Sequence, residues 1–191
     1  MSERRRITDA QTMRAFAHPV RIALLEALRR DGELTATRAA ELLDESPGNM
    51  SWHLQTLAKY GFVEEAPGAK GRSRPWRIVN DSTSFVATSE DPSVAAAGDA
   101  LLLQILDRNA NETREWLTTR HSFGSDWEHA AFFNNTLTYL TVEELANLSN
   151  EIAEIFDRHA ERAEKRARPE GAMPVRLTAQ GHPLPLTQAG N

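Results

Sequence analysis

The stretch DESPGNMSWHLQTLAKYGFVEE, residues 44–65, decides the fold of the amino-terminal part of this chain. Ser46–Pro47 joins a favoured N-cap to a favoured first helical residue, so a helix is expected to begin there. Met50, Leu54 and Leu57 recur at spacings of four and three, which predicts one buried face. The other positions are mostly small or polar residues rather than the Lys and Glu of an ordinary exposed helix.

Three shorter helices are expected before this stretch. The sequence predicts one over 9–18, which ends at His18 because Pro19 disfavours helical geometry at the residue before it. A second helix is predicted from Pro19 to Asp31. Leu34 is expected in a short extended piece, after which Thr35 can cap a third helix over 36–43. The turn between the third and fourth helices is then short.

A β-hairpin is predicted directly after the fourth helix. Gly61 ends that helix, 62–65 and 76–79 have the composition of strands, and the intervening 67–75 is rich in Gly and Pro. The loop holds three basic residues within five positions: Lys70, Arg72 and Arg74. This order of elements is that of a helix-turn-helix followed by a basic wing.

The arrangement favours binding to double-stranded DNA. A helix fits the major groove and its first half meets the base edges, so small residues and an Asn there suit close approach. A basic wing can contact phosphates or place one arginine in the minor groove. The predicted DNA-binding residues are Arg38, Ser46, Pro47, Gly48, Asn49, Ser51, Trp52, His53, Gln55, Lys70, Arg72 and Arg74.

Some of these assignments have open alternatives. Trp52 either packs against DNA or covers the helix beneath the wing. His53 either donates a hydrogen bond to a phosphate or forms one within the fold. The residues Arg4–Arg6 form either a minor-groove arm or a solvated polar tail.

The carboxyl-terminal part is expected to be mainly helical. A polar linker is predicted at 81–92, a long helix over 93–119 and a strand from Ala130 to Leu140. Thr141–Glu144 has the pattern of a capping box and should begin a helix that runs to Arg166. A further strand is predicted over 173–179. The expected domains are therefore a winged helix-turn-helix at 9–80 and a helical dimerisation domain at 93–180.

Two helices of this second domain offer apolar faces for a dimer. The residues assigned to dimerisation are Leu102, Ile105, Leu106, Trp116, Leu145, Leu148, Ile152, Ile155 and His159. Aromatic residues also gather between Trp116 and Tyr139. They favour a dimer core, because aromatic residues are enriched at interfaces, and a small-molecule effector pocket is the alternative.

Charge and composition limit the function classes. Residues 1–80 hold 13 Lys and Arg against 10 Asp and Glu, a net charge of +3, whereas residues 81–191 hold 9 against 17, a net charge of −8. Only the first part is therefore expected to meet a polyanion. The chain has no cysteine, which excludes thiol catalysis and Cys-ligated zinc. With no apolar run of membrane length or signal peptide, we expect a cytoplasmic, nucleoid-associated protein.

The segments AHPVRIALLEAL, LTATRAAELLDESPGNMSWHLQTLAKYGFVEE and GRSRPWRI resemble the winged helix of ArsR-type bacterial transcriptional regulators. The resemblance depends on His18–Arg21, the Ser51-x-His53-Leu54-x-x-Leu57 pattern and Gly61–Val63. The resemblance spans about residues 10–80, and the carboxyl-terminal part is more loosely similar to the dimerisation extension of larger members. It implies a homodimer that binds an inverted repeat near a promoter, usually as a repressor.

The chain departs from the metal-sensing members of that family. Their cysteine motif corresponds here to Glu41–Asp44, which contains no thiol. Another zinc pattern is matched by Asp157 and His159, but the position of its second His is Glu170. Three or four ligands are needed for zinc, so no metal or cofactor is predicted. His121, Asp126 and His129 have no recognised ligand spacing.

The favoured hypothesis is thus a homodimeric, sequence-specific regulator of transcription. The second hypothesis is a winged-helix module that binds protein instead of DNA. An enzyme is the third and weakest, because the sequence has no phosphate-binding loop and no recognisable catalytic triad.

Overall fold

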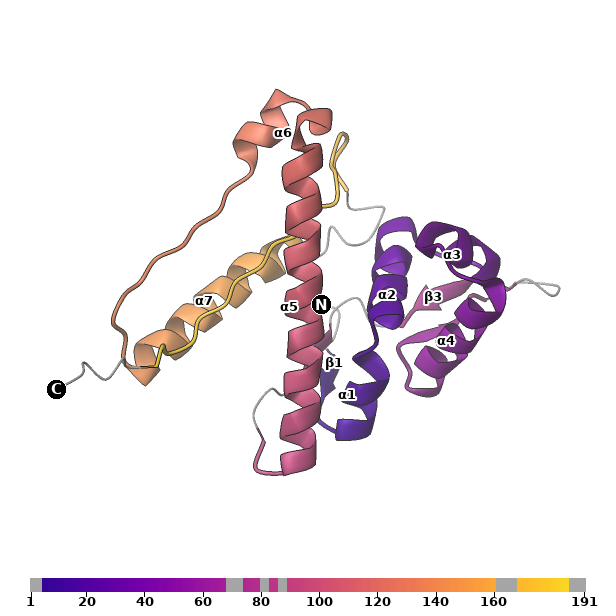
Figure 1. The fold of residues 1–191 in the computed structure, drawn as a ribbon, viewed down its shortest axis with the longest axis horizontal. Helices are drawn as coiled ribbons and strands as arrows, with labels where there is room; N and C mark the ends of the chain where they lie inside the picture. Colours follow the sequence, from indigo (N-terminus) through magenta and orange to yellow (C-terminus); the bar gives the residue numbers. More distant parts are fainter. Residues whose placement is uncertain (1–4, 68–73, 80–82, 86–88, 161–167, 186–191) are drawn as a thin grey trace. The chain divides into compact units, whose positions relative to one another are not determined.

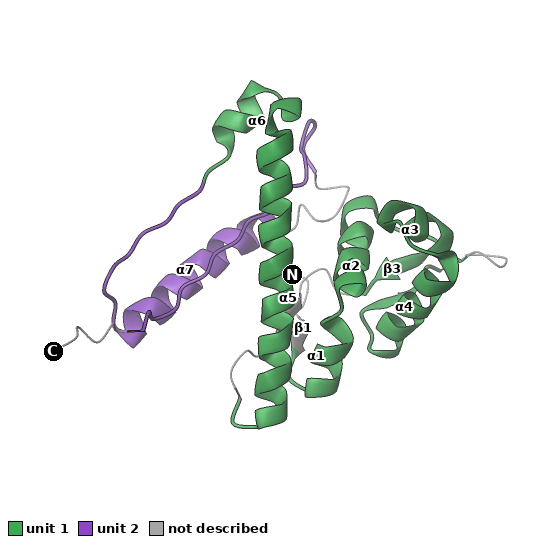
Figure 2. Ribbon diagram, in the orientation of Figure 1, with its two compact units in different colours: residues 1–132 green, residues 133–191 purple. Residues whose placement is uncertain are grey.

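The computed structural model describes residues 5–67, 74–79, 83–85, 89–160 and 168–185. The chain divides into two compact units, residues 1–132 and 133–191 (Figure 2). In the described ranges, no helix is long and apolar enough to span a membrane. The elements in chain order are β1 (Arg5–Ile7), α1 (Ala10–Phe16), α2 (Pro19–Asp31), α3 (Ala36–Leu43), α4 (Pro47–Lys59), β2 (Val63–Glu65), β3 (Trp76–Ile78), β4 (Thr83–Phe85), α5 (Pro92–Thr119), the 3₁₀ turn η1 (Arg120–Phe123), α6 (Ser125–Ala130) and α7 (Val142–Ala160).

Local residues set the starts of α3 and α4 and the ends of α2 and α3. Thr35 Oγ1 accepts a hydrogen bond from the amide of Arg38 at 3.2 Å, and Ser46 Oγ accepts one from the amide of Asn49 at 3.1 Å. Each bond satisfies a backbone donor that has no partner inside its own helix. At the other ends, Gly32 has φ 89° after α2 and Asp44 has φ 52° after α3. The positive φ at each position cannot continue a right-handed helix, and Asp44 adopts the left-handed helical conformation of a common C-cap.

The core of the first unit lies between α2, α3, α4 and the hairpin (Figure 1). The predicted stripe Met50, Leu54 and Leu57 is 0% exposed, and Leu24 of α2 is 0% exposed beside it. Each fully buried aliphatic side chain contributes about 1.5–3 kcal/mol relative to an exposed one. The stripe therefore fixes which face of α4 is turned inward and which face is left for a partner.

The predicted hairpin is present and gains a third backbone partner. β2 and β3 are antiparallel, with Val63 opposite Ile78 and Glu64 opposite Arg77. The extended residue Leu34 pairs with Trp76 through two backbone hydrogen bonds of 3.1 and 2.8 Å. The hairpin is thereby attached to the segment between α2 and α3, which fixes the base of the wing beside the helix-turn-helix.

Two segments predicted to be irregular form a small sheet. β1 and β4 are parallel, with Ile7 opposite Phe85. Ile7 is 2% exposed, so the supposed polar tail contributes to the core. The prediction of a linker at 81–92 is therefore wrong at Thr83–Phe85. A three-residue strand that pairs with a segment almost 80 residues away leaves no periodic signal in the sequence.

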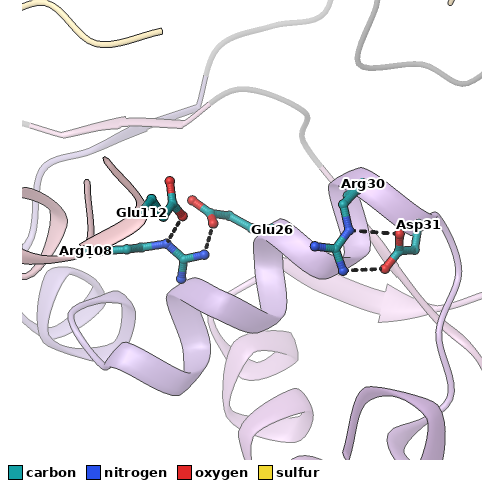
Figure 3. A network of polar contacts seen from close by, with 5 residues as sticks. All are labelled: Glu26, Arg30, Asp31, Arg108 and Glu112. Atoms are coloured by element: carbon teal, nitrogen blue, oxygen red, sulfur yellow. Dashed lines mark hydrogen bonds and ion pairs between the residues drawn. The ribbon is translucent and has the colours of Figure 1, made fainter. Parts of the chain in front are cut away.

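The long helix α5 belongs to the first unit (Figure 2). It packs along α1, and its residues Ala97 and Leu101 are 3% and 0% exposed. Arg108 forms ion pairs with Glu26 of α2 and with Glu112 of α5 itself, the latter at 3.0 Å (Figure 3). α5 is thus attached to α1 and α2, although the whole helix was predicted to belong to a separate domain.

The predicted capping box before α7 is confirmed. The amide of Thr141 donates to Glu144 Oε2 at 2.7 Å, and the amide of Glu144 donates to Thr141 Oγ1 at 3.2 Å. These hydrogen bonds lower the pKa of Glu144, because they favour the charged carboxylate. The predicted helix end at Arg166 lies outside the described residues.

The two strands predicted in the carboxyl-terminal part are wrong. Ala130 ends α6, and 131–141 and 172–185 contain no strand. Tyr139 is 95% exposed and Leu137 is 75% exposed. Alternating apolar residues favour a strand only when another strand satisfies the backbone, and the described part of this chain provides none for these segments.

Candidate nucleic-acid interface

The amino-terminal half of α4 presents small residues on an open surface. Pro47 and Gly48 are exposed and Ser51 is half-buried, while Met50 on the opposite face is buried. A methyl group placed on Gly48 meets no atom within 4 Å. Packing inside the chain therefore does not require glycine there, although glycine costs a helix up to about 1 kcal/mol relative to alanine. This surface permits another molecule to approach the backbone closely.

Trp52 and Gln55 lie on the outer side of the same helix. Trp52 is 56% exposed and contacts His53 edge-on, with ring centroids 4.7 Å apart. Gln55 is exposed, one turn beyond Ser51. The positions of both side chains are compatible with the predicted DNA contacts, which remain predictions.

His53 is buried rather than exposed on the surface of α4. Its side chain is 2% exposed and its ring lies 4.7 Å from that of His18, at the start of α2. The ring is therefore in the core and not on the surface where a phosphate contact was predicted. The other predicted role is not supported at Nδ1, which makes no hydrogen bond to the described residues. His53 packs as part of the inward face, three residues after Met50 and directly before Leu54.

Burial favours the neutral form of both histidines. Desolvation, followed by the charges of His18 and Arg21, lowers the pKa of His53. Desolvation, followed by the charge of Arg21, lowers the pKa of His18. Arg21 is itself 9% exposed and its Nε has no hydrogen-bond acceptor among the described residues. A proton on either ring would place a second positive charge beside Arg21 in a region of low dielectric constant.

Three of the predicted DNA-contacting donors are held by carboxylates of the same unit. Arg38 Nη1 lies 2.7 Å from Glu41 Oε2, Asn49 Nδ2 donates to Glu45 Oε2 at 2.8 Å, and Arg74 Nη1 lies 2.6 Å from Glu65 Oε2. The arginine pairs are about half exposed. Exposed ion pairs contribute little in water, so phosphates can compete for these arginines.

These carboxylate partners were not predicted, although the sequence contains a signal for each. Glu41 lies three residues after Arg38 on one helix, and Glu45 lies four residues before Asn49. Glu65 lies in β2, opposite the strand residue Trp76, and so lies close to the end of the loop that contains Arg74. Each acidic side chain reduces the positive charge that the predicted surface offers to DNA.

The recognition surface has few cations of its own. Between Ser46 and Tyr60 the only basic side chain is Lys59, at the last turn of α4. Lys70 and Arg72 lie outside the described residues. The structure does not describe the side chains of Arg4–Arg6, although the backbone of Arg5–Ile7 forms β1.

The residues assigned to dimerisation have different surroundings. Leu102 and Leu106 of α5 are each 38% exposed, whereas Ile105 packs against the core of the first unit, so its side chain is partly used within the chain. Trp116 is half-buried, with Arg120 6.0 Å from its ring centroid. On α7, Leu148 and Ile155 are 42% and 44% exposed, Leu145 and Ile152 are half-buried, and His159 is exposed.

Comparison with known proteins supports the geometry of the first unit. A family described as a helix-turn-helix domain matches residues 16–66, from the end of α1 to the residue after β2. Comparison with curated proteins gives no match. The matched range contains α2, α3, the three-residue turn at 44–46 and α4, which lie together around one core. The chain therefore carries a helix-turn-helix domain, the module with which many transcription regulators bind DNA.

Proposed function

We propose that this protein is a homodimeric, sequence-specific DNA-binding regulator of the ArsR type that represses transcription at an inverted-repeat operator in a bacterial cytoplasm. The observation that carries the proposal is the α4 surface of the helix-turn-helix domain. Its inward face is fixed by Met50, Leu54 and Leu57, and its outer face begins with Pro47 and Gly48, which leave the backbone accessible. That is the shape that a helix needs in the major groove.

Within this proposal, α4 supplies selectivity and the wing supplies affinity. The helix has one cation near its end, whereas the sequence of the predicted wing contains Lys70, Arg72 and Arg74 within five positions. Contacts between cations and phosphates make affinity depend on salt concentration, and contacts with base edges discriminate between sequences.

The exposed apolar residues of α5 and α7 support a homodimer. Leu102, Leu106, Leu148 and Ile155 are each between 38% and 44% exposed. A two-fold axis would present two α4 helices to half-sites about one helical turn, or about 10 bp, apart. Dimerisation also doubles the number of phosphate contacts, which one modestly charged unit needs.

Binding to the DNA upstream of the protein's own gene tests the proposal. In a gel shift we expect a retarded complex with that duplex in the presence of excess unrelated duplex. Analytical ultracentrifugation should give the molecular mass of two chains. A monomer that binds DNA would contradict the dimer, and equal competition by unrelated DNA would contradict sequence specificity.

A protein-interaction module is the second candidate. It is favoured by one observation, the pairing of Arg38 and Arg74 with Glu41 and Glu65, which reduces the charge available for phosphates. This function predicts no retarded complex with any duplex at low salt. The gel shift therefore separates the two candidates.

A further inference from the structure

The side-chain amide of Asn49 is held in one orientation by Glu45. Asn49 Nδ2 donates to Glu45 Oε2 at 2.8 Å, and both side chains are half-buried. The backbone on both sides is also fixed. The amide of Glu45 donates to the carbonyl of Ala40 at 3.0 Å, and the amide of Asn49 donates to Ser46 Oγ at 3.1 Å. The contact thus joins the turn after α3 to the first turn of α4.

An ionised carboxylate accepts hydrogen bonds and donates none. Of the two ends of the Asn49 amide, only Nδ2 can therefore face Glu45, because Oδ1 would be repelled. One N–H of Nδ2 is occupied by Glu45. The second N–H and Oδ1 remain for a partner outside the chain, since no other hydrogen bond joins the Asn49 side chain to the described residues.

One donor beside one acceptor is the pattern that complements adenine. In the major groove adenine presents N7 as an acceptor and the N6 amino group as a donor, whereas guanine presents two acceptors, N7 and O6. An amide rotated by 180° would turn its oxygen inward and offer its two N–H groups instead. The direction in which the amide faces therefore decides which purine fits.

We propose that Glu45 is a positioning residue that makes Asn49 select adenine over guanine at one position of each half-site. This inference rests on the proposed function, because it requires α4 to lie in the major groove. Glu45 adds a negative charge close to the DNA, which weakens overall affinity. Its contribution is discrimination between bases.

The informative variant is Glu45→Gln in the full chain. Glutamine has nearly the same shape, but its amide can accept from Nδ2 or donate to Oδ1, so both orientations of Asn49 become available. The matched control is Asp44→Asn, which removes one negative charge at the neighbouring position. Asp44 is exposed and asparagine tolerates its left-handed conformation. Thermal unfolding by circular dichroism checks that both variants are folded.

The assay is selection from a pool of duplex oligonucleotides with randomised positions, followed by sequencing. The wild type and Asp44→Asn are expected to select the same sequence, with adenine at one position of each half-site. Glu45→Gln is expected to lose about fivefold or more of the adenine preference there, with guanine rising, because a bidentate contact discriminates by about that factor or more. In an Asn49→Ala background, Glu45→Gln should have no further effect on that position.

The selection experiment distinguishes failure of the proposed function from failure of the proposed role of Glu45. If the wild type enriches no sequence, the proposed function is wrong. If the wild type enriches a sequence and Glu45→Gln keeps the same base preferences at every position, the proposed function stands and the role of Glu45 is refuted. A uniform change of affinity in both Glu45→Gln and Asp44→Asn, with no change of base preference, also refutes positioning and leaves only an effect of charge.

Discussion

The replacement Gly48→Ala should make the protein more stable and worse at binding DNA. Gly48 lies in the first turn of α4, and a methyl group added there meets nothing within 4 Å. The free chain therefore gains helix propensity without a clash. The gain from replacing glycine by alanine in a helix is about 0.5–1 kcal/mol, which corresponds to a rise in Tm of about 1–4 °C for a chain of this size.

The same methyl group points to the surface that is proposed to face the major groove. If the backbone approaches DNA there, the methyl group must displace it, and such overpacking costs about 1–3 kcal/mol. Affinity for the selected operator should then fall about 5- to 150-fold. Thermal unfolding measures the first effect, and fluorescence anisotropy with a labelled duplex measures the second.

The control is Gly32→Ala, the same chemical change at the end of α2. Gly32 has φ 89°, which alanine rarely adopts, so this variant should lose stability. Operator affinity measured well below its Tm should stay near that of the wild type. If Gly48→Ala leaves the operator affinity unchanged, the close approach of DNA to α4 is refuted. If Gly48→Ala lowers the Tm instead, the argument from open space around Gly48 is wrong.

Three further predictions concern the core and the wing. Leu54→Ala, at a 0% exposed position, should lower the free energy of unfolding by about 2–5 kcal/mol, and a loss below 1 kcal/mol in urea unfolding would contradict its place in the core. Burial lowers the pKa of both His53 and His18, so the unfolded chain binds protons that the folded chain does not. The free energy of unfolding should therefore fall as pH drops below about 6.5, the ordinary histidine value, until the folded rings also protonate. His53→Phe should flatten this decline, and an equal slope in the variant would show that His53 does not cause it. Arg74→Ala should reduce the slope of log affinity against log salt concentration by about 1 and weaken unrelated sequences equally, whereas an unchanged slope would mean that Arg74 stays with Glu65.

The helix-turn-helix could be predicted because its signals are local. Ser46 caps α4 through its hydroxyl, Pro47 and Gly32 act through their backbone conformations, and the spacing of Met50, Leu54 and Leu57 fixes the buried face. The same spacing contained the signal for His53, which lies three residues after Met50 and one before Leu54. The sequence left His53 open between a phosphate contact and a hydrogen bond within the fold, whereas its position on the helix makes it part of the inward stripe.

The segments whose secondary structure was wrongly predicted depend on partners that are distant in the sequence. Ile7 is buried because β1 pairs with β4, and no local pattern in either segment specifies the other. Residues 131–141 have the alternation of a strand but no described partner strand. The carboxylate that faces Asn49 was missed for a different reason. Its spacing is local, but a donor that suits DNA suits a neighbouring carboxylate equally well, so the residue type alone does not reveal which partner it has.

The proposed function requires two copies of α4 to bind two half-sites of DNA. The most direct measurement is the set of sequences that the full-length wild-type protein enriches from randomised duplexes. The proposal predicts an inverted repeat whose half-site centres lie about 10 bp apart, or a multiple of that distance. A pool with the same base composition after selection as before, or an enriched site without two-fold symmetry, would contradict it.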